Sequence, residues 1–182
     1  MASPFVDGAL RVLRQVASRA LERSTRPARP EASATLKTTR QERPHQATDG
    51  YPGDFRGRPE IVYRPHNDRF ADPGEVVWTW VPYEEDHSAG KDRPVLLIGR
   101  DGPWLLGLQV TSQDHDRDAE QEARAGRFWI DIGAGGWDAQ GRPSEARVNR
   151  IIRIDPQSVR RVGAVLDEDT FRAVTDEVLR FY

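Results

Sequence analysis

Short runs of apolar residues follow one another along the C-terminal part of the chain, which indicates a strand-rich fold. Six runs rich in β-branched and aromatic residues occupy residues 75–81, 93–99, 104–110, 127–132, 146–154 and 159–165. Asp101-Gly102, between the second and third runs, is a hairpin signal. Acidic residues 167–169 suit the first turn of a final helix, whose predicted buried stripe is Phe171, Val174, Val178 and Phe181. This pattern predicts a mainly β (α+β) fold, a small and strongly bent barrel with a C-terminal helix.

The chain before residue 73 shows three other patterns. Apolar residues recur at spacings of three and four within residues 4–23, so we expect segment 1–23 to be an amphipathic helix. Residues 24–50 have almost no large apolar side chains and are typical of a disordered linker. Residues 51–72 carry aromatic residues among prolines and glycines. We expect them to be an irregular arm that packs on a barrel formed by residues 73–182.

The apolar face of the predicted N-terminal helix needs a partner, because a single helix of this size is marginal alone. That partner is its own domain, another protein, a second chain or a membrane surface. The arginines and scarce acidic residues of this segment also resemble a mitochondrial transit peptide. No apolar run reaches the roughly 18 residues that a membrane-spanning helix needs, and we expect a cytoplasmic protein without membrane association.

Charge and composition exclude several classes of site. Residues 1–71 carry a net charge of +5 and residues 72–182 a net charge of −7. The acidic half argues against a broad, non-specific nucleic-acid surface, so a nucleic-acid site would have to be a local basic one. The chain has no cysteine, which excludes disulfides, a thiolate nucleophile and Cys-ligated zinc.

No cofactor or metal site is expected either. The Asp114, Asp116 and Asp118 series fails as a calcium loop, because Ala119 and Ala125 replace its glycine and glutamate. The glycines of residues 133–136 lack the spacing of a dinucleotide site. The four histidines show no metal-ligand spacing.

One pair of strands offers candidate chemistry. Arg93 begins the second apolar run, and Thr111 and Ser112 end the third. If these strands pair antiparallel, the three side chains converge on one rim. A guanidinium grips phosphate in a bidentate manner, and a hydroxyl adds a further hydrogen bond, so the rim favours phosphodiester chemistry. The alternatives are a surface ion pair of Arg93 with Asp92 or Glu85, and an ordinary strand-end role for the hydroxyls.

A series of short motifs runs through residues 73–180. They are Pro73-Gly74-Glu75-Val76-Val77-Trp78, Gly90-Lys91-Asp92-Arg93-Pro94-Val95-Leu96, Val110-Thr111-Ser112, Ser144 before a strand, Arg150-Ile151-Ile152-Arg153-Ile154-Asp155, and Val162-Gly163 to Leu166-Asp167. In this order they resemble the PemK/MazF toxin family. The resemblance implies an SH3-like barrel, usually a homodimer, that cuts single-stranded RNA without a metal by 2′-hydroxyl attack. It also implies restraint by a cognate antitoxin, with DNA binding in the toxin–antitoxin complex.

The same resemblance assigns roles to residues. The family's catalytic arginine falls on Arg93 and its catalytic threonine on Thr111, with Ser112 as an auxiliary donor. The loop of residues 82–92 would cover the site and select bases. In it Lys91 is a candidate RNA contact, and Tyr83 and His87 are candidates for stacking on an unstacked base, although solvated loop positions are the alternative.

Some features depart from this family pattern. Glu84, Glu85 and Asp86 make the same loop acidic and would repel RNA. Salt screens such repulsion at distances beyond about 8 Å. His115 is a candidate proton shuttle, but its acidic neighbours favour a solvated loop. Two other functions therefore remain open: a catalytically weak barrel that acts as a nucleic-acid- or protein-binding regulator, and an adaptor recruited to membranes by residues 4–23.

Overall fold

The structure, a computed structural model, describes residues 50–66, 68, 70–112 and 124–182. The predicted helix of residues 1–23, nearly all of the predicted linker and His115 lie outside the described residues. Six strands form one antiparallel sheet in the order β4-β5-β3-β2-β1-β6. Their bounds are β1 (Glu75–Pro82), β2 (Gly90–Asp101), β3 (Trp104–Thr111), β4 (Trp129–Gly133), β5 (Ser144–Ile154) and β6 (Arg161–Val165).

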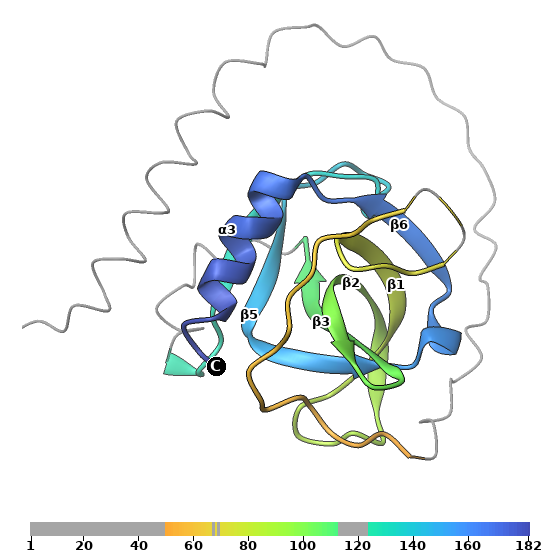
Figure 1. Cartoon of the computed structure of the whole chain (residues 1–182), viewed down its shortest axis with the longest axis vertical. Coiled ribbons are helices and arrows are strands. Elements are labelled where there is room, and N and C mark those ends of the chain that lie inside the picture. Colours follow the sequence, from red (N-terminus) through yellow and green to blue (C-terminus); the bar gives the residue numbers. More distant parts are fainter. Residues whose placement is uncertain (1–49, 67, 69, 113–123) are drawn as a thin grey trace, which may run out of the picture. The chain divides into compact units, whose positions relative to one another are not determined.

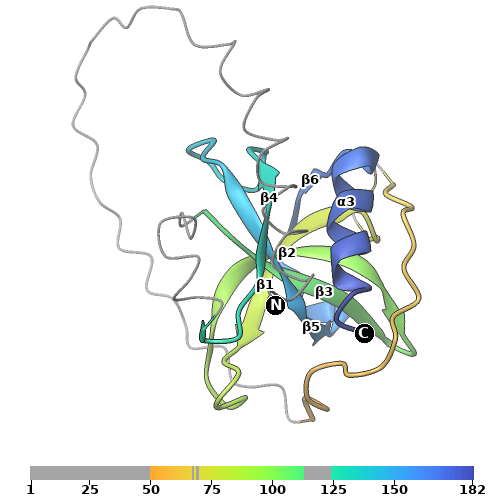
Figure 2. The ribbon, with the colours of Figure 1, turned by 90° about the vertical axis from the view of Figure 1, so that its left-hand side faces the viewer.

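The sheet curls into a partial barrel, and the helix α3 (Glu168–Val178) lies along one side of it (Figures 1 and 2). Register shifts interrupt four of the five strand pairs, for example between Leu97 and Gly99 of β2 and between Leu108 and Val110 of β3. Such bulges bend strands and increase their twist. The expected mainly β fold with a bent barrel and a C-terminal helix is therefore confirmed.

Residues 95–98 of strand β2 are all apolar because both faces of the strand are buried there. Leu96 and Ile98 pack in the cluster that includes Phe171 and Val174 of α3. Val95 and Leu97 point to the opposite face and join a second cluster. A strand covered on both faces reads as a continuous hydrophobic run, which is the pattern seen in residues 95–98.

The final helix differs from its prediction at one end. Asp167 caps its start, with the carboxylate accepting a hydrogen bond from the Thr170 amide at 2.9 Å. The helix ends at Val178, so Phe181 is not on its buried stripe. Phe181 is 41% exposed and its ring contacts that of Phe128 at 5.0 Å between centroids. The prediction that Phe181 belongs to the stripe was wrong, because helical periodicity stops where the helix stops.

Several strand boundaries also moved, and the largest shift is that of β2, which begins at Gly90, three residues before its prediction, and ends at Asp101, two residues after it. β4 begins at Trp129, two residues after its prediction, and β5 begins at Ser144, two residues before. The run predicted from residue 159 starts at Arg161, because a short 3₁₀ turn, η3 (Pro156–Ser158), precedes it. Element ends are set by turn contacts rather than by hydrophobic pattern, so shifts of this size are expected.

Residues 50–66 cross the barrel before β1 begins (orange in Figure 1). The Phe55 amide donates to the Ile151 carbonyl at 2.9 Å, and the Tyr63 hydroxyl donates to the Leu166 carbonyl at 2.8 Å. At Gly99 a Cβ atom would lie 2.2 Å from the Glu60 carbonyl oxygen, so only glycine admits this segment so close. Phe70, by contrast, is largely exposed.

Candidate active site

Strands β2 and β3 bring Arg93 and Thr111 together. Their pairing sets Val95 opposite Gln109, and Arg93 and Thr111 each lie two residues beyond that pair on their own strands. The tight turn at Gly102, whose φ of +56° suits glycine, fixes this hairpin. Arg93 and Thr111 both line two cavities, one of about 370 Å³ and one of about 650 Å³.

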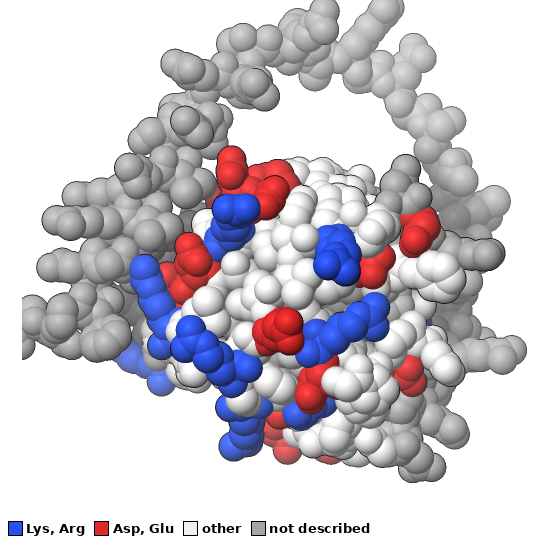
Figure 3. Space-filling view, in the orientation of Figure 1, with Lys and Arg blue, Asp and Glu red and all other residues white. Residues whose placement is uncertain are grey.

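The smaller cavity is locally basic within an acidic half of the chain. On the face seen in Figure 3, acidic and basic side chains are interspersed. Around the smaller cavity, five basic side chains face two acidic ones, Glu84 and Glu85. The basic residues are Lys91, Arg93, Arg127, Arg147 and Arg150. This is the kind of local site that an acidic domain would need in order to hold an anionic chain.

The arginines of this cavity differ in how they are neutralised. Nη1 of Arg147 lies 2.9 Å from a carboxylate oxygen of Glu84. Arg150 pairs with Asp54 at 2.8 Å. Among the described residues the guanidinium of Arg93 makes no side-chain hydrogen bond or ion pair, so it presents an uncompensated, half-buried cation to both cavities.

The alternative ion pair of Arg93 is absent from the described part of the chain. Asp92 pairs with Arg160 instead. Glu85 lines the smaller cavity, and none of the ion pairs among the described residues includes it. A guanidinium held in this way can accept a phosphate without first giving up a protein partner.

The loop between β1 and β2 forms one wall of the smaller cavity. The Tyr83 amide donates to the Ala89 carbonyl at 2.9 Å and closes the loop. Asp86 accepts hydrogen bonds from the hydroxyl and amide of Ser88, which hold the pKa of its carboxyl below the usual range. Tyr83 and Lys91, the candidate RNA contacts of this loop, both line the smaller cavity. His87 lines neither cavity, because its ring packs against Tyr51 at 5.0 Å between centroids.

Two tryptophans line the larger cavity. The Nε1 of Trp78 donates to the Trp137 carbonyl at 3.0 Å, and the Nε1 of Trp137 donates to the Ser144 hydroxyl at 3.1 Å. Ser112 also lines this cavity, but not the smaller one. The structure therefore separates Ser112 from the basic cavity, while Thr111 reaches both.

Asp138 is an acidic residue in the wall of the larger cavity. A hydrogen bond from Arg142 is the main cause that holds the pKa of Asp138 below its usual value, and the Ser112 hydroxyl contributes a smaller hydrogen bond. Ser112 is thus directed toward a carboxylate as well as toward the cavity.

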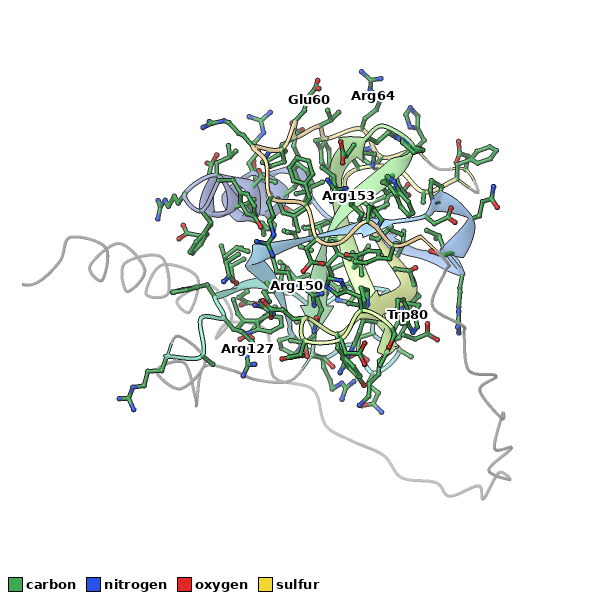
Figure 4. All side chains as sticks on the ribbon, turned by 90° about the horizontal axis from the view of Figure 1, so that it is seen from below. Glu60, Arg64, Trp80, Arg127, Arg150 and Arg153 are labelled. Atoms are coloured by element: carbon green, nitrogen blue, oxygen red, sulfur yellow. The ribbon has the colours of Figure 1, made fainter. Side chains whose placement is uncertain are left out.

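Sequence reasoning missed Arg127 and Arg147 as parts of the site, and Arg150 entered only as part of a motif. Arg147 and Arg150 occupy buried positions of β5, and a charged residue at such a position is unusual enough to be a signal. Seen from below, Arg150 lies near the middle of the molecule, between Arg127 and the edge at which Glu60 and Arg64 lie (Figure 4).

The described residues contain neither a candidate metal cluster nor a membrane-spanning helix. In that part of the chain no group of three or more His, Cys, Asp or Glu side chains is arranged to hold a metal ion. None of its helices has the length and apolarity to span a bilayer.

Comparisons with known proteins concern the same stretch of chain. Residues 72–182 match the sequence model of the PemK-like, MazF-like toxin of type II toxin-antitoxin systems. Similar solved structures include MazF of Deinococcus radiodurans, at 17% identity and a TM-score of 0.43, over 61% of this chain and 94% of that one. A MazE-MazF structure from the same organism has 17% identity, a TM-score of 0.42 and the same coverage. Among curated proteins none matches.

Proposed function

Since this chain belongs to the PemK-like, MazF-like toxin family, we propose that it is an endoribonuclease that cleaves single-stranded RNA. The observation that carries the proposal is Arg93, a half-buried cation without an ion-pair partner among the described residues, beside Thr111 at the junction of two cavities. A phosphodiester at this junction would have one cavity on each side for the flanking nucleotides.

The chemistry needs no group beyond the RNA and the protein. The RNA 2′-hydroxyl attacks the adjacent phosphorus, so the bond from the 2′-oxygen to phosphorus forms and the bond from phosphorus to the 5′-oxygen breaks. The 2′-hydroxyl loses its proton and the departing 5′-oxygen gains one. Arg93 grips the phosphoryl oxygens and assists this proton transfer, and Thr111 donates to the charge that builds up on them. Ser112 adds a donor from the side of the larger cavity.

Substrate binding would use the remaining cations of the smaller cavity. Lys91, Arg127 and Arg147 attract the RNA backbone, and Tyr83 provides an aromatic face for a base. His87 acts indirectly in this proposal, because its ring is engaged by Tyr51.

Partners and organisation complete the proposal. We expect a cytoplasmic homodimer that is inhibited by a cognate antitoxin and binds DNA in the toxin–antitoxin complex. The division into an N-terminal helix (1–23), linker (24–50), arm (51–72) and barrel (73–182) is likewise proposed, and the first two segments lie outside the described residues.

RNA cleavage by the purified full-length protein tests this function. A labelled single-stranded RNA should be cut in the presence of EDTA, and Arg93→Ala should lose about 10²–10³ or more of the rate, as is common when one preorganised donor is removed. Arg100→Ala is the matched control, because Arg100 lies on the same strand but lines neither cavity. Equal cleavage by the Arg93→Ala protein would refute the assignment.

A second function is favoured by one observation. Glu84 already neutralises Arg147 in the smaller cavity, and this favours a barrel that binds nucleic acid or protein without efficient cleavage. Induced expression separates the two functions: growth arrest by the wild type but not by Arg93→Ala supports the nuclease. Unchanged growth with both, together with intact RNA, supports the binding regulator.

A further inference from the structure

A residue that precedes the family domain neutralises a buried arginine of the smaller cavity. The family match starts at residue 72, yet the carboxylate of Asp54 accepts hydrogen bonds from Nε and Nη2 of Arg150 at 2.8 and 3.2 Å. The Tyr51 hydroxyl donates a third at 2.6 Å. Arg150 is 5% exposed and lines the cavity that holds Arg93. Part of this cavity wall therefore depends on the N-terminal arm.

Arg150 also contacts the start of the loop between β1 and β2. Its Nη2 also donates to the Pro82 carbonyl at 3.0 Å, and Pro82 is the last residue of β1. A second contact reaches the same loop, because the Tyr51 ring packs edge-on against the ring of His87. Residues 51–54 thus contact this loop at two points, at Pro82 through Arg150 and at His87 through Tyr51.

Arg153 of β5 contacts the arm at this point. Nη1 of Arg153 donates to the carbonyls of Gly53 and Asp54 at 2.9 and 3.1 Å, and its guanidinium lies 5.2 Å from the centroid of the Phe55 ring. Burial acts to raise the pKa of Asp54, but the hydrogen bonds from Arg150 and Tyr51 outweigh it and hold the pKa below its usual value. The carboxylate is therefore charged at neutral pH.

Loss of Asp54 would leave a cation without a countercharge. Within the described residues the remaining partner of Arg150 would be the neutral Pro82 carbonyl. A buried charge needs a paired and hydrogen-bonded partner, so Arg150 would turn toward the cavity and release Pro82. The loop would then lose its anchor at the end nearest Tyr83.

We propose that residues 50–55 are a functional part of the site, with Asp54 as a positioning residue that fixes Arg150 and, through it, the loop of residues 83–89. The arm thereby determines how an RNA nucleotide is seated in the smaller cavity and which sequences are cut. This inference rests on the proposed endoribonuclease function for its substrate, but the coupling between arm and loop can be measured without RNA.

The test compares full-length wild type, Asp54→Asn and Asp54→Glu with Asp101→Asn as the matched control. Asp101 pairs with Arg153 at 2.7 Å, so its replacement removes an ion pair beside the arm without touching Arg150. Hydrogen exchange of the amides of residues 83–89 is expected to be at least about tenfold faster in Asp54→Asn, as suits the loss of hydrogen bonds to a charged group. Asp54→Glu should restore part of the protection, and Asp101→Asn should leave the loop as in wild type.

Cleavage adds a functional readout. Asp54→Asn should raise KM more than it lowers kcat, and should cut RNA at additional sequences, whereas Asp101→Asn keeps the wild-type set of cuts. Loop exchange and cut sites in Asp54→Asn that are the same as in wild type would overturn the proposal. If the wild type cuts no RNA, the proposed function fails, while the exchange data still decide whether arm and loop are coupled.

A milder variant covers the case in which Asp54→Asn does not fold. Tyr51→Phe removes only the hydroxyl that binds the Asp54 carboxylate and keeps the ring against His87. It should accelerate exchange in residues 83–89 by a smaller factor and broaden the cut sites in the same direction. Unchanged exchange and unchanged cuts in Tyr51→Phe would contradict the inference.

Discussion

The ion pair between Glu84 and Arg147 is expected to compete with RNA phosphate for the same cation. Arg147 is 6% exposed by its side chain and Glu84 is 49% exposed, and both line the smaller cavity. In Glu84→Gln the amide oxygen can still accept a hydrogen bond from Arg147, but the negative charge is gone. We therefore expect Glu84→Gln to bind RNA more tightly than wild type.

The size of this effect follows from the geometry. An ion pair with one exposed member contributes about 0.2–1 kcal/mol, which corresponds to about a 1.4- to 5-fold gain in RNA affinity. Arg147 is then available to one more phosphate, so the plot of log affinity against log salt should become steeper by about 0.7, the increment for one contact to a single strand.

The assay is fluorescence anisotropy with a labelled 2′-O-methyl RNA, which lacks the attacking hydroxyl, at salt concentrations of about 50 to 200 mM. Glu85→Gln is the matched control, because it removes the same charge from the same loop, and none of the ion pairs among the described residues includes Glu85. Equal affinities and equal salt slopes for Glu84→Gln and Glu85→Gln would refute the reasoning, as would weaker binding by Glu84→Gln.

Three further predictions concern stability, each measured by urea unfolding. Ser144→Ala leaves the buried indole N–H of Trp137 without its acceptor and should lower the free energy of unfolding by about 1–3 kcal/mol. An unchanged free energy of unfolding would contradict this. Phe171→Ala removes a fully packed core ring and should cost about 3–5 kcal/mol, whereas a loss below about 1 kcal/mol would mean that the helix is not docked as described. The pKa of Asp54 is lowered in the folded state, so the stabilisation by its carboxylate is present above about pH 4 and is lost as the pH falls through the lower folded value. Wild type should therefore lose more free energy of unfolding than Asp54→Asn between about pH 4 and pH 2. Parallel losses in the two proteins would exclude Asp54 as the cause.

Hydrophobic pattern was sufficient for the strands because local burial decides where they form. The run at residues 95–98 is apolar at every position, and the structure buries it on both faces. The bulges that curl the sheet, such as the one between Leu97 and Gly99, have no comparable sequence signal. Phe181 shows the opposite failure: its spacing fits a helical stripe, but the helix ends at Val178.

The candidate site could be predicted only in its local part. Arg93 and Thr111 lie on consecutive strands, so one hairpin sets them side by side. The contact between Asp54 and Arg150 joins residues 96 positions apart, and no local pattern records it. Arg147 and Arg150 were missed for the related reason that they reach the cavity from β5, which follows β3 only after a long connection.

The central claim is that Arg93 and Thr111 promote attack by an RNA 2′-hydroxyl, and one substrate tests it directly. Cut sites are first mapped on a long RNA, and a DNA oligonucleotide is then made with a single ribonucleotide on the 5′ side of the cut. The account predicts cleavage at that position in EDTA, a 2′,3′-cyclic phosphate on the upstream product by mass spectrometry, and no cleavage of the all-deoxy oligonucleotide. Cleavage of the all-deoxy strand, or activity only with an added metal ion, would contradict it.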